Sequence, residues 1–317
     1  MLKFLILLFS IFSIVACATI QLGPSIGPLE EIILEGKGQE KILLIELQGV
    51  INNQKGLSVT GATTSLGMVE WVREVIDKAE KDRDIRALLI KINSPGGTVT
   101  ASDIILHELL TYKKKQGIPI YIQVMDLAAS GGYYIALAGD KIFAHPTSLI
   151  GSIGVIAFKV NLEGLMGKIG VTWEVVKSGD KKDFMSPFRP FSENEKELFQ
   201  ETINKFHYRF VSLIAKNRKE LAIDDVKLVA DGRIFDANNA LNLKLIDNVA
   251  YLSETIDTIK KDTKNSELQV ISYQREGDYK PNLYSFFSQP SGFDLSNLKT
   301  AIGNKILNPL FSYLWLP

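Results

Sequence analysis

Two kinds of apolar pattern alternate along the chain, and together they predict strands interleaved with helices. At residues 68–79 and 100–114 apolar side chains recur at helical spacing, so each helix would cover one face of a sheet. Gly117 follows the second stripe as a helix stop. This alternation predicts an α/β fold. Short apolar runs predict the strands, at residues 42–46, 87–93, 119–125, 141–144, 154–159 and 171–176.

The pattern changes after residue 190. Ser192 and Glu195 form a capping box that begins a long helix over about 192–218. After D-G-R, which ends at Arg233, we expect a turn, a strand and a short helix from near Asp236. The apolar face of the long helix carries Leu198, Phe199, Ile203, Phe206, Phe210, Leu213 and Ile214.

The chain ends on N-P-L-F-S-Y-L-W-L-P, an apolar segment that follows a stretch mixed in Pro, Gly, Asn and Ser. Three roles fit such a segment: a packed terminal strand, a contact between protomers, or a substrate-like strand added to an active-site groove. The pattern alone leaves the three open.

The N-terminus predicts export or anchoring. Lys3 precedes thirteen residues that are apolar or Ser, which is short for a bilayer span of about 20 residues and typical of a signal peptide. The run I-V-A-C resembles a lipobox, so Cys17 would be lipidated. Alternatively, an uncleaved anchor runs from Leu2 to about Leu22. Either way the globular body lies on the far side of the cytoplasmic membrane, with Lys3 inside.

Composition supports a globular body and excludes several classes of function. With 317 residues, of which 46% are hydrophobic, the chain has ample core for one or two domains. Lys and Arg (36) balance Asp and Glu (36), so nothing indicates a nucleic-acid partner. Cys17 is the only cysteine and allows no internal disulfide. The chain has no H-E-x-x-H metal motif and no phosphate-binding loop motif, and we expect neither a metal nor a cofactor.

Ser130 is the candidate nucleophile, within the segment M-D-L-A-A-S-G-G-Y-Y-I-A. A serine reacts only where its proton can leave and backbone N–H groups can meet the resulting oxyanion, which requires small neighbours. Gly131 and Gly132 provide that access. Upstream, the strand at 87–93 ends in S-P-G-G at residues 94–97, a turn whose glycines can expose their N–H groups. The two loops could face one reacting carbonyl.

The general base is harder to identify from residues alone. Of the three histidines, His107 and His207 lie on predicted helices and fit structural roles, whereas His145 precedes Pro146 in a loop near the site. Lys182, in the irregular segment K-S-G-D-K-K-D-F-M-S-P, is the better candidate. A lysine serves as a base only where desolvation or a nearby cation favours its neutral form.

Five ordered blocks resemble the signal peptide peptidase A (SppA) family, membrane-bound serine peptidases with a Ser/Lys dyad. The similarity extends over residues 41–249. The blocks are N-S-P-G-G (93–97), D-L-A-A-S-G-G-Y-Y (126–134), I-G-S-I-G-V (150–155), K-S-G-D-K-K-D-F-M-S-P-F-R (177–189) and D-G-R-I-F (231–235).

The resemblance implies a role for each matched residue. Ser130 matches the nucleophile and Lys182 the general base, while Ser152 matches the hydroxyl that orients the lysine amine. Gly97 and Gly131 match the two main-chain donors of the oxyanion hole. The neighbouring Gly96 would shape the turn rather than donate.

The resemblance also implies an architecture, a ClpP/crotonase-like repeated ββα superhelix with a C-terminal helical extension for oligomerisation. We therefore expect a signal peptide or anchor at 1–23, a peptidase domain at 24–260 that includes the helix at about 192–218, and a tail at 261–317. In the short form of the family, ring-like homo-oligomers build each active site from adjacent protomers. The implied substrates are hydrophobic peptides such as remnant signal peptides.

Two other functions remain open. Crotonase-like folds also process acyl-CoA thioesters with the same kind of oxyanion pocket, although an export signal argues against a cytosolic CoA ligand. A non-enzymatic envelope scaffold would require a degenerate dyad, whereas Ser130, Lys182 and Ser152 are all present.

Overall fold

The apolar runs form the central sheet of the protein. The computed structural model describes residues 27–57, 63–275, 282–285 and 312–315. The predicted anchor at 1–23 and Cys17 lie outside these residues. Within them, a nine-stranded sheet has the order β1-β12-β2-β5-β7-β8-β11, with β9 beside β7 and β10 beside β9. Its strands are β1 (Glu30–Glu35), β2 (Lys41–Gln48), β5 (Ile85–Ser94), β7 (Ile120–Ala129), β8 (Lys141–Ala144), β9 (Leu149–Gly151), β10 (Ile234–Asp236), β11 (Asn248–Val249) and β12 (Gln269–Gln274).

Most neighbouring strands of this sheet are parallel. The exceptions are β1 against β12 and β10 against β9, which are antiparallel. β12 comes from the segment predicted as a tail, and it pairs in parallel with β2 inside the sheet. Parallel strands are joined by helical crossovers, which agrees with the alternation of strands and helices in the sequence. The prediction of an α/β fold is confirmed.

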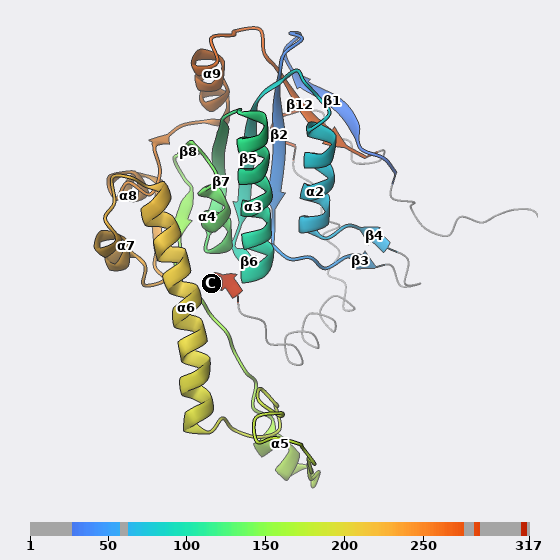
Figure 1. Cartoon of the computed structure of the whole chain (residues 1–317), viewed down its shortest axis with the longest axis vertical. Coiled ribbons are helices and arrows are strands. Elements are labelled where there is room, and N and C mark those ends of the chain that lie inside the picture. Colours follow the sequence, from blue (N-terminus) through green and yellow to red (C-terminus); the bar gives the residue numbers. More distant parts are fainter. Residues whose placement is uncertain (1–26, 58–62, 276–281, 286–311, 316–317) are drawn as a thin grey trace, which may run out of the picture.

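Helices cover both faces of the sheet because alternate side chains of each strand point to opposite faces. In β2, Leu43 and Ile45 belong to one core cluster, whereas Ile42 and Leu44 belong to the other. The first cluster is covered by α2, α3 and α4 and the second by α9, on opposite sides of the sheet (Figure 1). These helices are α2 (Met68–Ala79), α3 (Val99–Gln116), α4 (Gly131–Ala136) and α9 (Leu252–Asp262).

The predicted helix boundaries are close to those observed. Gly117 ends α3 with a φ of +70° in the left-handed region. Ser192 and Glu195 form the predicted capping box at the start of α6 (Glu193–Asn217). Asp236 caps α8 (Ala237–Asn242) by accepting a hydrogen bond from the Asn239 N–H at 2.9 Å.

An extension projects from the body along α6. The buried apolar residues of this helix, Phe210, Val211 and Ile214, lie in its C-terminal part. Its N-terminal part runs away from the body towards α5 (Glu163–Lys168), as Figure 1 shows. We use "extension" for residues 157–192, which include α5. The remaining elements are α7 (Ile223–Val229), the hairpin of β3 (Gly56–Leu57) and β4 (Thr63–Ser65), and the two-stranded sheet of β6 (Gly96–Thr98) and β13 (Ser312–Leu314).

Two predicted strands are wrong. Residues 154–159 contribute only an isolated bridge, between Ile156 and Ser312. Residues 171–176 form no strand and lie in the extension, where Trp173 and Val176 are exposed. Among the residues that the structure describes, no strand pairs with this segment. In the described part of the chain, no helix combines the length and apolar character needed to cross a membrane.

Candidate active site

Ser130 occupies a sharp turn between strand β7 and helix α4. Its φ of +53° and ψ of −112° lie in a region that residues with a side chain rarely adopt. The next residues must be small, because a Cβ on Gly131 would lie 2.5 Å from the Ser102 Oγ and one on Gly132 would lie 3.0 Å from the Ser94 carbonyl oxygen. The geometry is that of a nucleophile elbow, in which a strained strand-to-helix turn presents a serine.

Ser152 lies beside Ser130 because their two strands are parallel neighbours. The register pairs Ala129 of β7 with Gly151 of β9, and each serine follows its strand by one residue. The Ser130 N–H donates to the Gly151 carbonyl oxygen at 2.7 Å. Ser152 also has a positive φ, +49°, and its N–H donates to the Arg233 carbonyl oxygen at 2.7 Å. The D-G-R segment therefore supports the turn that carries Ser152.

The S-P-G-G turn after β5 faces Ser130. The Ser94 hydroxyl fixes this turn by donating to the Gly49 carbonyl oxygen at 2.6 Å and accepting from the Gly96 N–H at 3.1 Å. A Cβ on Gly131 would lie 3.1 Å from the Gly97 nitrogen, so the two predicted oxyanion donors are close neighbours. The two glycine-rich loops meet at one point.

A carbonyl oxygen of the C-terminal strand lies at that same point. A Cβ on Gly96 would be 2.0 Å from the Tyr313 carbonyl oxygen and 2.8 Å from the Gly131 nitrogen, and a Cβ on Gly131 would be 3.1 Å from the same oxygen. With φ +99°, Gly96 also has a backbone conformation that disfavours a side chain. The turn therefore has room for a peptide carbonyl only because Gly96 lacks a Cβ.

β13 lies as an added strand in a groove between β6 and residue 156. Tyr313 is opposite Gly97 in antiparallel register, and the Trp315 N–H donates to the Pro95 carbonyl oxygen at 2.8 Å. Hydrogen-bonded pairs recur every second residue in an antiparallel ladder, so Tyr313 and Gly97 also form such a pair. At the other edge, Ser312 and Ile156 exchange two hydrogen bonds of 3.0 Å. Of the three roles left open for the tail, both a packed terminal strand and a substrate-like strand agree with this position.

The Tyr313 side chain fills a slot between α4 and α6. It is fully buried, with its ring centroid 4.9 Å from those of Tyr134 and Phe210. Its hydroxyl donates to the Phe206 carbonyl oxygen at 3.0 Å. From the sequence pattern, Phe206 and Phe210 belong only to the apolar face of the long helix. The recurring aromatic residues on that face were the one available signal.

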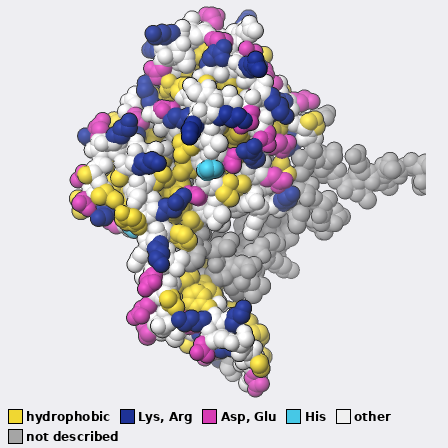
Figure 2. All heavy atoms as spheres, viewed as in Figure 1, with side chains coloured by type: hydrophobic (Ala, Val, Ile, Leu, Met, Phe, Trp, Pro, Cys, Tyr) yellow, Lys and Arg dark blue, Asp and Glu magenta, His cyan; other side chains and the backbone are white. Residues whose placement is uncertain are grey.

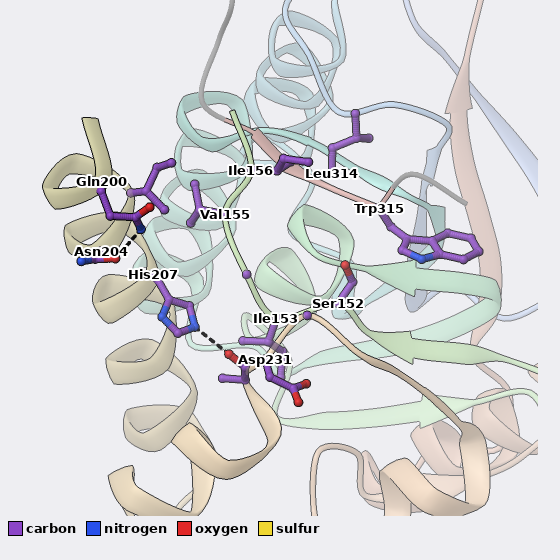
Figure 3. A pocket seen from close by; sticks show the side chains of 14 residues that line it. Ser152, Ile153, Val155, Ile156, Gln200, Asn204, His207, Asp231, Leu314 and Trp315 are labelled. Carbon is purple, nitrogen blue, oxygen red and sulfur yellow. Dashed lines mark hydrogen bonds between the residues drawn. The ribbon is translucent and has the colours of Figure 1, made fainter. Parts of the chain in front are cut away.

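Beyond Tyr313 the groove opens into a cavity of about 420 Å³ (Figure 3). Leu314 and Trp315 border one side and α6 the other. His207 lines this cavity, with its Nε2 2.8 Å from the Ala230 carbonyl oxygen. The other lining residues are Ser152, Ile153, Gly154, Val155, Ile156, Gln200, Ile203, Asn204, Ala230, Asp231 and Gly232.

Lys182 is not part of this constellation in the single chain. It is exposed in the segment between α5 and α6, where its backbone N–H donates to the Gly179 carbonyl oxygen at 3.0 Å. That segment lies at the far end of the extension, away from α4 (Figure 1). The structure thus brings together Ser130, Ser152, Gly97 and Gly131, but not Lys182.

An ionic network holds the Lys182 segment on the start of α6. Arg189 donates to both Asp183 and Glu195, with nitrogen–oxygen distances of 2.7 to 2.8 Å. The Arg189 guanidinium lowers the pKa of Glu195 to about 2, with the Ser192 N–H contributing. Arg189 and Lys177 hold the pKa of Asp183 well below its usual range.

The histidines have other partners. His145 lies in the loop after β8, with its Nδ1 2.9 Å from the Thr147 hydroxyl and its ring edge-on to Tyr251. His107 is exposed on α3. Among the residues that the structure describes, no group of His, Cys, Asp and Glu side chains is arranged to hold a metal ion.

Comparisons with known proteins identify the family. Residues 112–266 match the model of peptidase family S49, and residues 48–150 match that of the Clp protease family. A protein from Enterococcus faecium, provisionally named signal peptide peptidase SppA, is 37% identical over 78% of this chain and 71% of its own length. Protease 4 from Haemophilus influenzae is 28% identical over 68% of this chain, which spans only 34% of that larger protein. The chain has a ClpP/crotonase-like α/β fold and belongs to the signal peptide peptidase A family of S49 serine peptidases.

Proposed function

We propose that this chain is a serine endopeptidase that cleaves extended peptides bound in the groove now occupied by β13. The observation that carries the proposal is the position of the Tyr313 carbonyl oxygen beside the Gly97 and Gly131 nitrogens, next to Ser130. A peptide that adds to the same edge of β6 would present its scissile carbonyl to the same two donors.

The proposed reaction is acyl transfer to Ser130. The hydroxyl oxygen attacks the carbonyl carbon while neutral Lys182 takes its proton, and the oxyanion accepts hydrogen bonds from the Gly97 and Gly131 N–H groups. The C–N bond then breaks, and the lysine ammonium protonates the leaving amine. Lys182 next takes a proton from water as that water attacks the ester, and the released Ser130 oxygen regains a proton. Ser152 would orient the lysine amine.

Lys182 would come from an adjacent protomer of a ring-like homo-oligomer. A lysine acts as a base only where it is removed from water, and the exposed Lys182 has no such environment in one chain. In support, the extension exposes apolar side chains that a neighbouring copy could bury, as the view of the surface illustrates (Figure 2). The exposed apolar residues of the extension are Leu165, Ile169, Val171, Trp173, Val175 and Val176.

We further propose that the enzyme is anchored in the bacterial cytoplasmic membrane, with its catalytic domain on the extracytoplasmic, periplasmic side. The support is the N-terminal pattern of Lys3, an apolar run and Cys17. An anchor raises the local concentration of membrane-embedded substrates, which fits hydrophobic peptides such as remnant signal peptides. Mass spectrometry of the membrane-extracted protein tests the anchor: a lipidated N-terminal Cys17 supports the lipoprotein form, and an intact chain starting near Met1 supports the spanning form.

The decisive experiment uses two inactive variants of the detergent-purified protein. Ser130→Ala and Lys182→Ala should each abolish hydrolysis of an apolar fluorogenic peptide. An equimolar mixture, unfolded and reassembled, should recover part of the activity, because some sites would combine an intact serine with an intact lysine from the neighbouring protomer. Activity that survives Lys182→Ala would refute the dyad, and a mixture that stays inactive would refute the shared site.

A further inference from the structure

We propose that Arg189 is a positioning residue for Lys182, and that it fixes the direction in which the extension presents the lysine amine. This inference deepens the proposed function and rests on it. Arg189 touches neither Ser130 nor the groove, so it acts on the reaction through the general base alone. Such a device is needed because none of residues 157–192 is buried in the single chain.

The Arg189 guanidinium makes five hydrogen bonds, which equals its number of N–H donors. Two of them form a forked pair with the Asp183 carboxylate, at 2.7 and 2.8 Å. Two more form a second forked pair with Glu195, at 2.7 and 2.8 Å. The fifth is donated to the Pro190 carbonyl oxygen at 3.0 Å. A planar guanidinium held by two carboxylates fixes an angle as well as a distance, which a single ion pair does not.

The two carboxylates belong to the two parts that Arg189 joins. Glu195 lies in the first turn of α6 and is itself fixed there, because it accepts from the Ser192 N–H at 2.9 Å in the capping box. Asp183 directly follows Lys182 in the sequence. α6 reaches from the body to this end of the extension (Figure 1). The connection from the body to the lysine therefore runs along α6 and through Arg189.

Ring contacts attach the same segment but define its orientation less closely. Phe184 and Phe191 pack on Phe199 of α6, with ring centroids 5.6 and 5.8 Å apart. Aromatic pairs are favourable over a range of distances and tilts, so these rings can shift while they stay in contact. Replacement of Arg189 should therefore displace Lys182 without detaching the extension.

Arg189 also keeps the neighbouring carboxylate occupied. Asp183 accepts hydrogen bonds from Arg189 and, at 2.8 Å, from the Lys177 amine. A carboxylate next to a lysine favours the charged form of that lysine unless other cations engage it. A general base must be neutral before it takes a proton. The pairing of Asp183 with Arg189 and Lys177 therefore suits the role of Lys182.

The test assigns the effect of Arg189→Gln to one half of the shared site. In a reassembled mixture of Ser130→Ala and Lys182→Ala chains, every complete site takes its lysine from the Ser130→Ala chain. Arg189→Gln in that chain should lower kcat about 10- to 10²-fold relative to the unchanged mixture, the effect of a base misplaced by about 1 Å, and leave KM unchanged. In the Lys182→Ala chain, which supplies only the serine, Arg189→Gln should change neither constant.

Equal losses in the two arrangements would overturn the inference, because a variant that only weakened folding or assembly would act from either chain. Lys196→Gln is the matched control. It removes an exposed ion pair with Glu193 in the same first turn of α6, and it should leave kcat unchanged in both arrangements.

Limited proteolysis reports on the lysine segment without the peptidase reaction. In the full Ser130→Ala chain, Arg189→Gln should raise the rate of tryptic cleavage after Lys181 and Lys182 severalfold, as mass spectrometry of the fragments measures. If the reference mixture of Ser130→Ala and Lys182→Ala stays inactive, the shared site fails alone, and faster cleavage still supports the role of Arg189. An unchanged cleavage rate would overturn that role whether or not the mixture is active.

Discussion

Ser130 and Ser152 both keep a left-handed backbone conformation, which costs on the order of 1–3 kcal/mol at each residue. Each is held there by a main-chain hydrogen bond from its own N–H, to Gly151 and to Arg233 respectively. The parallel register of β7 and β9 places the two serine turns side by side at the ends of these strands. The residues next to these two serines should tolerate few substitutions, because the backbone of both turns is already strained.

Gly96→Ala should abolish peptidase activity without unfolding the protein. The new Cβ would occupy the place of the Tyr313 carbonyl oxygen, 2.0 Å away, and approach the Gly131 nitrogen at 2.8 Å. We expect kcat/KM to fall by about 10²-fold or more, as when an oxyanion contact is lost. Gly117→Ala is the matched control, since Gly117 also has a positive φ but has open space around a Cβ. Equal losses in the two variants would contradict the steric argument.

Lys91→Met should destabilise the body by removing one partner of a buried ion pair. Lys91 and Glu46 form an ion pair of 2.9 Å between neighbouring strands, and both side chains are at most 5% exposed. Lys91 also donates to the Leu283 carbonyl oxygen at 2.9 Å. Removing one partner of a buried pair typically costs about 3–5 kcal/mol. Urea unfolding measures this, and the double variant with Glu46→Leu should recover much of the loss. A double variant as unstable as Lys91→Met would show that packing, not the charge, is responsible.

At the scale of elements, the extension is attached to α6 by ionic contacts and by ring contacts of Phe184 and Phe191 with Phe199 of α6. Arg189 joins Asp183 of the extension to Glu195 in the first turn of α6. Burial of this part of the chain is slight, and α5 has no buried residue. The position of the Lys182 segment should therefore respond to the charge of these carboxylates.

Acid should weaken the attachment of the extension to α6, leaving the ring contacts with Phe199 in place. The folded-state pKa of Glu195, about 2, lies below its ordinary value of 4.5, and the pKa of Asp183 is lowered as well. Carboxylates with lowered pKa values stabilise the folded contact above their ordinary pKa, and this contribution is lost as the pH falls from about 4.5 towards 2. Trp173, which packs on Phe188, should report the change by its fluorescence once the other two tryptophans are replaced by phenylalanine. If the Arg189→Gln variant showed the same change of fluorescence over the same pH range, the ionic contacts of Arg189 would not be its cause.

At the scale of the whole molecule, the sequence predicted what depends on local pattern. The helices at 68–79 and 100–114 and the capping box at Ser192 could be predicted because periodicity and capping are local properties. The failed strand at 171–176 has the right alternation, but a strand needs a neighbour, and the sequence does not show that this segment leaves the body. The aromatic slot was equally out of reach, because it joins residues 134, 210 and 313 through tertiary contact alone.

Release of β13 should raise the peptidase activity. A strand tethered to its own groove competes with substrate at an effective concentration of about millimolar. This exceeds the concentration at which most peptide substrates are present. Tyr313→Ala removes the buried ring and its hydrogen bond to Phe206, so kcat/KM for a peptide with tyrosine before the cleaved bond should increase about tenfold or more. Tyr284→Ala, at an exposed position upstream in the same C-terminal region, is the control and should change nothing. If Tyr313→Ala instead lowered both the activity and the melting temperature, β13 would be a packing element that the site requires, and substrates would have to enter by another edge.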